Sequence, residues 1–177
     1  MNRDDRNLIV QARSGDQEAF TRLVMNYKQY VYRTIYGMVA NAYDAQDLAQ
    51  ETFIKAYQAL PTLRDETTFP TWLARIAIHV SSDFLRKKQR QKELNERLFH
   101  HEKHEEHQQA STRWDLQDAL LRLSEEHRTV LLLRTVQELH YEEIAQIMNI
   151  PIGTVRSRLY AARKKLHELL QEGGDER

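Results

Sequence analysis

Apolar residues recur every three or four positions along most of the chain, which is the spacing of amphipathic α-helices. The pattern is clearest over residues 139–170, where two such runs flank a break at 149–153 that contains a proline and a glycine. One stripe of the second run is wholly apolar and comprises Val155, Leu159, Ala162, Leu166 and Leu169. We therefore predict two helices around a tight turn, the second starting near Thr154 as its N-cap.

The face opposite that apolar stripe is cationic, and no acidic residue lies between Gly153 and His167. In a helix-turn-helix the second helix enters the major groove of DNA, and its first residues contact base edges. Arg156 and Ser157 are accordingly predicted to contact bases. The residues expected to bind phosphates are Arg158, Arg163, Lys164 and Lys165, and Thr154 and Tyr160 belong to the same DNA-binding face. A solvated charged face is the alternative, but the turn and the lack of acids together favour DNA binding.

The N-terminal half shows helical periodicity as well. Two helices are predicted between residue 5 and about residue 38, separated by a break at 14–16. The second of them has a buried stripe of Phe20, Leu23, Val24, Tyr27, Val31, Ile35 and Met38. A third helix is predicted from Asp44, as its N-cap, to about Leu60. After a loop at 60–68, a fourth is predicted from Pro70 to about Arg90.

The predicted helix from Asp44 to Leu60 places an isoleucine in an acidic, amide-rich outer strip. This strip comprises Asp47, Gln50, Glu51, Ile54 and Gln58. Such a strip suits the docking of a protein partner, although a single exposed apolar residue is also ordinary. The pattern alone leaves both interpretations open.

The predicted helix from Pro70 to Arg90 has a polar face with basic character. Its positions are Arg75, His79, Ser82, Arg86 and Gln89, and the helix ends in a basic run at 86–90. Cations near a helix C-terminus are also favoured by the helix dipole, so this run has a purely structural interpretation as well. Phe69 and Trp72 beside the stripe add the aromatic groups that stack on single-stranded bases.

Residues 91–113 are almost wholly polar and are predicted to form a flexible tether. Their histidines could bind a divalent metal and comprise His100, His101, His104 and His107. Apolar periodicity resumes from Trp114, with Ser124 as a candidate cap. The chain is thus predicted to be all-α, with two small helical domains at 1–92 and 113–172, a linker at 93–112 and a tail at 173–177. The second domain contains the helix-turn-helix.

Composition narrows the function classes. The 177 residues carry 26 basic and 26 acidic side chains, so any positive potential is local. The absence of cysteine excludes disulfides and thiolate metal sites. No apolar run approaches the ~20 residues of a membrane helix, and the N-terminus lacks a signal-peptide pattern. A cytoplasmic protein without membrane insertion is expected. No nucleophile–base pair or phosphate loop indicates an enzyme, and no cofactor is expected.

Four stretches, in this order, resemble the extracytoplasmic-function (ECF) group of bacterial RNA polymerase sigma factors. They are GDQEAF at 15–20 with Tyr27 and Tyr32, DAQDLAQETF at 44–53, FPTWLARIA at 69–77 with Asp83 and Arg86, and the helix-turn-helix at 141–158. The last is shared with other regulators, but the four together are specific. The resemblance covers nearly the whole chain apart from the linker and tail.

The resemblance implies roles for individual residues. A polymerase-docking surface would comprise Asp44, Asp47, Leu48, Gln50, Glu51 and Ile54. It would bind the clamp coiled coil of the largest subunit of core RNA polymerase, and the flap of the large subunits would be a further contact. Contacts with the promoter −10 element would come from Arg64, Asp65, Phe69, Trp72, Arg75, His79, Arg86 and Lys87, with the loop at 64–69 capturing a flipped base. The helix-turn-helix would read the −35 element, the linker would thread toward the RNA exit path, and an anti-sigma factor would be a further partner.

Three positions depart from the family pattern. Ile78 stands where arginine is common and His79 where asparagine is usual, so the −10 contacts are expected to differ. His140 replaces a serine-like cap, which predicts a less well capped helix start. A stand-alone helix-turn-helix regulator and a metal-responsive module working through residues 100–107 are the alternatives.

Overall fold

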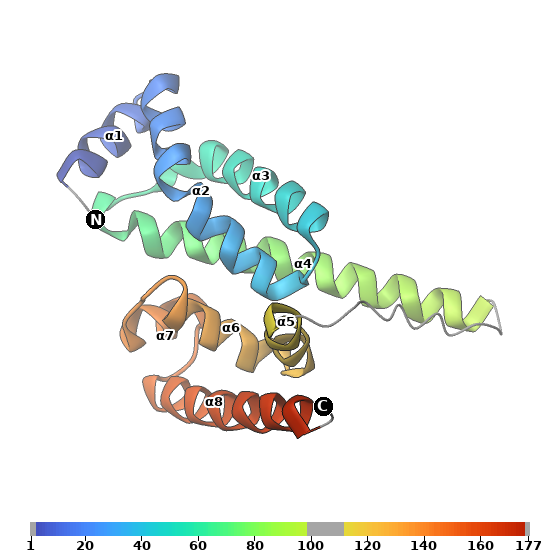
Figure 1. Ribbon diagram of the computed structural model, residues 1–177. Coiled ribbons are helices and arrows are strands. Elements are labelled where there is room, and N and C mark those ends of the chain that lie inside the picture. The colour runs from blue at the N-terminus through green and yellow to red at the C-terminus, as the bar shows by residue number, and fades with distance from the viewer. Residues whose placement is uncertain (1–2, 99–111, 176–177) are drawn as a thin grey trace.

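The computed structural model describes residues 3–98 and 112–175, and every regular element in these two ranges is a helix (Figure 1). The first range forms α1 (Arg3–Arg13), α2 (Gln17–Val39), α3 (Ala42–Ala59) and α4 (Phe69–Leu98), with short 3-10 helices at Leu60–Thr62 and Glu66–Thr68. The second forms α5 (Thr112–Arg122), α6 (Glu125–Thr135), α7 (Tyr141–Met148) and α8 (Ile152–Asp175). The all-α prediction is confirmed. None of these helices is long and apolar enough to span a bilayer. The histidines at 100–107 lie outside the described residues.

The first two breaks in the N-terminal half follow from local chemistry. Gly15 adopts a φ of 99°, which glycine tolerates, and the Asp16 carboxylate then caps α2 by accepting from the N–H groups of Glu18 and Ala19. Asn41 caps α3 in the same way. The prediction that Asp44 caps this helix is therefore wrong, because the cap lies three residues earlier. Asp44 instead lies in the first turn, where the helix dipole favours its negative charge.

Helix α4 extends to Leu98, eight residues beyond the predicted end near Arg90. Residues 91–96 are exposed and all polar except Leu94, which is itself 50% exposed, so no buried apolar stripe marks this extension in the sequence. The extension consists of good helix formers and is supported by side-chain pairs at i, i+4, such as Gln89 with Glu93 (2.8 Å) and Lys92 with Glu96 (3.8 Å). The tether predicted from residue 91 therefore begins as helix.

The helix-turn-helix is confirmed, but its second helix starts earlier than predicted. Asn149 ends α7 in the left-handed region, and α8 begins at Ile152. The N–H groups of Thr154 and Val155 bond to the carbonyl of Pro151, so Thr154 lies inside the first turn and is not the cap. At its other end α8 continues to Asp175, past the point where a tail was predicted. Ser124 does cap α6, by accepting from the His127 N–H.

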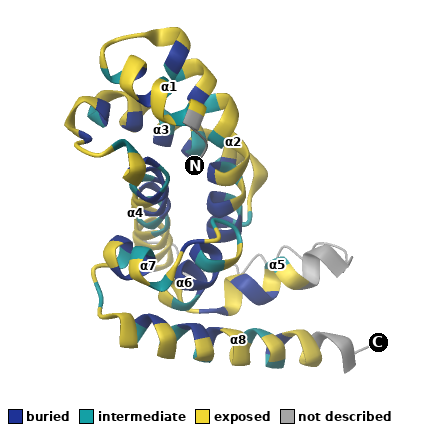
Figure 2. Ribbon diagram, turned by 90° about the vertical axis from the view of Figure 1, so that its left-hand side faces the viewer, coloured by how far each residue is buried: buried dark blue, intermediate teal, exposed yellow. Residues whose placement is uncertain are grey.

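Helix α6 packs against helices of both the N-terminal and the C-terminal part of the chain. Six consecutive residues of this helix, from Arg128 to Leu133, are buried, so α6 is covered on all sides. Figure 1 shows α6 between α8 and the N-terminal helices α2 and α4, and Figure 2 shows the dark, buried residues gathered along these contacts. Because buried residues from both described ranges form one cluster, the core is continuous between the two parts.

Candidate nucleic-acid and partner interfaces

Helix α8 has one buried side and one exposed side, as a helix that binds in the major groove of DNA requires. Its apolar stripe is buried, with Val155, Leu159 and Ala162 each at most 2% exposed. The opposite side chains are exposed and form the α8 face: Arg156, Ser157, Tyr160, Arg163 and Lys164. The Tyr160 side chain is 74% exposed, and the Ser157 hydroxyl donates to the Thr154 carbonyl (3.1 Å). The predicted division of α8 into two faces is confirmed.

Two cations beside this face already have acidic partners. The Arg158 guanidinium forms an ion pair with Glu126 of α6 (2.8 Å), and its side chain is only 22% exposed. Lys165 pairs with Glu168 on its own helix (3.6 Å). Arg156, Arg163 and Lys164 have no ion pair within residues 3–98 and 112–175. These three side chains can therefore bind a phosphate group without first breaking an ion pair.

The outer surface of α3 is a mixed acidic and apolar strip. Asp47, Gln50, Glu51 and Ile54, here called the α3 strip, are all exposed, and Ile54 is 50% exposed. Glu51 pairs with Lys55 (2.8 Å). Two other residues of the predicted docking set behave differently. Asp44 pairs with Lys88 of α4 (3.3 Å), and Leu48 is only 6% exposed because it packs into the core.

Tyr43 extends the α3 strip and was missed from the sequence. It lies four residues before Asp47, on the same side of the helix, and is 81% exposed. Its spacing from Asp47 and Ile54 is the signal that could have found it. An unburied tyrosine beside an exposed isoleucine enlarges the apolar part of this surface.

Phe69 differs from its predicted role. Its side chain is 1% exposed, with its ring centroid 5.3 Å from that of Tyr27 and 5.7 Å from that of Trp72. The ring therefore fills the space between the start of α4 and α2, and it is not available to stack on a base in this arrangement. Trp72 is half-buried, so part of its ring remains open to solvent.

The loop before α4 is fixed by side-chain bonds. Asp65 caps the turn at Glu66–Thr68 by accepting from the Thr67 N–H (2.8 Å) and hydroxyl (2.7 Å), and these bonds lower the pKa of the Asp65 carboxyl. Arg13 of α1 donates to the Leu63 carbonyl (2.9 Å) and pairs with Glu66 (2.9 Å). Arg64 and Asp65 are both exposed on this braced loop.

The basic face of α4 is divided along its length. His79, Arg86 and Lys87 are exposed, although Arg86 pairs with Asp83, whose carboxyl pKa is lowered by that bond. Nearer the helix start, Arg75 donates to the Gln146 carbonyl of α7 (2.7 Å). The Thr71 hydroxyl donates to the Glu143 carboxylate of α7 (2.9 Å). The sequence did not predict that α7 would contact this face.

Glu143 also bears on the predicted weakness at the start of α7. Its second carboxylate oxygen accepts from the backbone N–H of His140 (2.8 Å), which is half of a capping box. Glu143 thus satisfies the backbone N–H of residue 140, whereas a serine-like side chain at 140 would accept from an N–H group in the first turn of α7. Within the described ranges, no three His, Cys, Asp or Glu side chains are grouped as a metal site.

Comparison with protein families matches both parts of the chain. The model of Sigma-70 region 2 matches residues 23–91, and that of Sigma-70 region 4 matches residues 113–166. The ECF RNA polymerase sigma factor SigW of Bacillus subtilis is 34% identical across 93% of this chain and 95% of its own. The RNA polymerase sigma-H factor of Pseudomonas aeruginosa is 36% identical across 94% of each chain.

Two solved structures share the fold. CnrH, in complex with the cytosolic domain of CnrY, gives a TM-score of 0.73 at 25% identity, over 96% of this chain and 98% of its own. The sigma factor RpoE from Bartonella quintana, in complex with the anti-sigma factor NepR, also gives 0.73 at 25% identity, over 86% and 96%.

Proposed function

Because the chain belongs to the ECF sigma factors of bacterial RNA polymerase, we propose that promoter recognition is divided between the α4 and α8 faces, with the α3 strip holding polymerase. A sigma factor of this group binds core polymerase and directs initiation at promoters through their −10 and −35 elements. The residue assignments that follow are our proposal. The observation that carries it is the α8 face, which is exposed, cationic and free of acids on a helix whose other side is buried.

The α3 strip is proposed to bind the clamp coiled coil of the polymerase. Its exposed isoleucine gives an apolar anchor, and Asp47 and Glu51 set a negative charge around it. Leu48 supports this surface from within the core, and Asp44 orients α3 through its pair with Lys88. Tyr43 adds a further contact at the N-terminal end.

The α8 face is proposed to read the −35 element. Arg156 and Ser157 lie in the first turns of the helix, where a groove-bound helix meets base edges, and Arg156 can bond both acceptors of a guanine. Tyr160, Arg163 and Lys164 would follow the phosphates, and Arg158 would join them on leaving Glu126.

The loop and basic face of α4 are proposed to hold the melted −10 element. Arg64 and Asp65 would surround an unstacked base, whose removal from the stack costs about a few kcal/mol. The exposed part of Trp72 offers a stacking surface, and Arg75, His79, Arg86 and Lys87 supply charge along the strand. Phe69 is proposed to position this site from the core.

Neither face is expected to suffice alone. Two weak readers held by one polymerase at a fixed separation gain effective concentration, so the affinity for a correctly spaced promoter exceeds that of either. The proposal includes the domain boundaries at 92/93 and 112/113 and a location in the cytoplasm, where core polymerase works. It also includes an anti-sigma factor as a partner and no catalytic activity of the chain's own.

Transcription from a promoter library by core polymerase, with and without this chain, tests the proposal. We expect initiation that depends on the chain and selects a defined pair of elements. The variant Ile54→Asp should abolish initiation and polymerase binding, whereas Gln29→Leu on the exposed side of α2 should not. If the chain instead binds palindromic DNA tightly without polymerase, it is a stand-alone regulator.

A further inference from the structure

Helix α1 contacts the loop that precedes α4. A single nitrogen of the Arg13 guanidinium, Nη1, lies 2.9 Å from the Leu63 carbonyl oxygen and 2.9 Å from a Glu66 carboxylate oxygen. These two partners stand on either side of Arg64 and Asp65, the pair proposed to surround the captured base. Arg13 therefore fixes both ends of the short segment that carries this pair.

The other side-chain hydrogen bonds of this loop are local. Within the described residues they span two or three positions, and they join Thr62 to Ala59 and both Thr67 and Thr68 to Asp65. Bonds of this kind shape a single turn, but they do not set where that turn lies on the domain. The two bonds of Arg13, in contrast, tie the exposed part of the loop to another helix.

Helix α1 is itself fixed to the domain. Its Ile9 side chain is fully buried in the core. Near the start of the helix, the Asp5 carboxylate accepts from the Asn26 side chain (3.0 Å) and from the Tyr27 hydroxyl (3.2 Å) of α2. Because both its apolar side and its first turn are bound to neighbouring elements, α1 is a firm support from which Arg13 can hold the loop.

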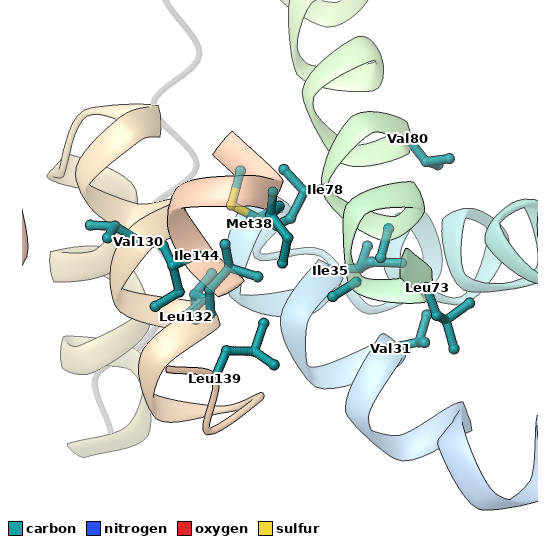
Figure 3. Packing of buried hydrophobic residues seen from close by; sticks show 14 of the residues in the cluster. Val31, Ile35, Met38, Leu73, Ile78, Val80, Val130, Leu132, Leu139 and Ile144 are labelled. Atoms are coloured by element: carbon teal, nitrogen blue, oxygen red, sulfur yellow. The ribbon is translucent and has the colours of Figure 1, made fainter. Parts of the chain in front are cut away.

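The other end of the loop is fixed by apolar packing. Phe69, the first residue of α4, is buried against Tyr27 as described. One turn later, Leu73 of α4 lies beside Val31 and Ile35 of α2, within the buried cluster (Figure 3). Because α4 begins from a packed position, the conformational freedom that remains lies in the exposed segment before it, which α1 holds.

The ion pair of Arg13 is better shielded from water than a typical surface pair. The side chains of Arg13 and Glu66 are 32% and 26% exposed, whereas those of the Arg22–Glu18 pair on α2 are 64% and 78% exposed. Salt screens a partly buried pair less than an exposed one. A loop that is held in shape before binding loses less conformational entropy when its ligand arrives, so the ligand that fits this shape binds more tightly.

We propose that Arg13 is a positioning residue for base capture, and that it holds the loop in the shape that selects the base at one position of the −10 element. This inference rests on the proposed function. Arg13 does not touch DNA in this role but acts through Leu63 and Glu66 on Arg64 and Asp65. Helix α1, which carries none of the predicted binding residues, thereby contributes to promoter choice.

A charge-neutral double variant tests this role. Arg13→Met keeps the apolar stem of the side chain but cannot donate a hydrogen bond, and Glu66→Gln removes the opposite charge so that the local net charge is unchanged. Holoenzyme is assembled from core polymerase and the full chain. Forked promoter fragments carry each of the four bases, or an abasic site, at each −10 position in turn, and the dissociation constant of each fragment is measured.

We expect wild-type holoenzyme to discriminate between bases at the position that the loop captures. The double variant should reduce this discrimination roughly fivefold or more, the size of a typical coupling between two sites. Preferences at the other −10 positions and in the −35 element should not change. Where an abasic site occupies the captured position, the loop has no base to select, so wild type and double variant should bind equally.

The matched control is Arg22→Met with Glu18→Gln, which removes an ion pair of the same length (2.9 Å) whose two residues both lie on α2. It should discriminate between bases as wild type does. If the Arg13 double variant does not fold, Glu66→Gln alone decides, because it removes the ion pair and should still lower discrimination at the captured position. Unchanged discrimination in Glu66→Gln then overturns the inference.

Two results with a folded double variant overturn the inference. One is discrimination equal to that of wild type at every −10 position. The other is an equal loss of affinity for base-bearing and abasic fragments, which would make Arg13 a residue that only stabilises the fold. If wild-type holoenzyme binds base-bearing and abasic fragments alike at every −10 position, the proposed function of the loop is itself overturned, whatever Arg13 does.

Discussion

The two DNA-facing helices hold their cations in different states. On α8, Arg156, Arg163 and Lys164 project into solvent and are free to meet phosphate or base. On α4, Arg75 is bonded to α7, and its neighbour Ile78 is buried there. Both helices present basic residues at helical spacing, but on α4 Arg75 is bonded to another helix while His79, Arg86 and Lys87 remain exposed. The difference shows that a charge pattern identifies a binding face but not whether the chain itself already occupies it.

The largest expected effect concerns Arg128 of α6, which is buried and donates to the carbonyls of Met38, Leu121 and Leu123. Arg128→Ala should lower the free energy of unfolding by about 3 kcal/mol, because it leaves buried carbonyl groups without a donor. Chemical denaturation followed by circular dichroism measures this loss. Arg156→Ala on α8 serves as the control and should change stability by less than about 0.5 kcal/mol. If both variants lose a similar free energy of unfolding, the buried Arg128 is no more important for stability than the exposed Arg156.

The next effect concerns base reading on α8. Arg156→Ala should weaken binding of the polymerase complex to the −35 element by about 1–3 kcal/mol and relax its preference at one base position. Competition between promoter fragments with single base changes measures both. If the variant keeps the wild-type order of preference, Arg156 does not read a base.

A smaller and different effect is expected from Lys164. Lys164→Ala should weaken binding by about 1 kcal/mol or less and equally for every fragment, because a phosphate contact carries no sequence information. The same competition experiment detects this uniform loss. A change in the order of fragments would assign Lys164 to base reading and reverse its role with Arg156.

The smallest expected effect concerns the ion pair between Arg158 of α8 and Glu126 of α6. Glu126→Gln should release Arg158 and raise affinity for promoter DNA by about 0.5 kcal/mol or less, as expected from a partly exposed ion pair. Glu168→Gln is the control, because it frees the more exposed Lys165. A loss of affinity in Glu126→Gln would mean that the pair positions Arg158 for DNA.

Helix faces were predictable because burial repeats with the helical period. The apolar stripe of α8, the buried side of α3 and the break at Gly15 all follow from local spacing and local conformational preference. Helix ends were less predictable, because neighbouring residues compete for the same role. Asn41 caps α3 in place of Asp44, and α4 continues through exposed residues that are polar apart from Leu94 and form no buried stripe.

The contact between the domains was not predictable from these patterns. Ile78 stood out only as a departure from a family, and Gly37 carried no signal, since one missing side chain has meaning only beside Leu132. Leu48 and Phe69 were assigned to binding surfaces, although both are buried. Whether an apolar side chain at the edge of a stripe packs inside or remains outside depends on elements far along the chain.

The hydrogen bonds between the N-terminal and C-terminal helices are accepted mostly by neutral backbone carbonyls. Arg128 donates to the Met38 carbonyl, and Arg75 donates to the Gln146 carbonyl. Dissolved ions screen such bonds and apolar packing little, whereas they compete directly with cations for DNA phosphate. As ionic strength rises, the affinity of the α8 face for promoter DNA should fall, while the contact between the N-terminal and C-terminal helices should persist.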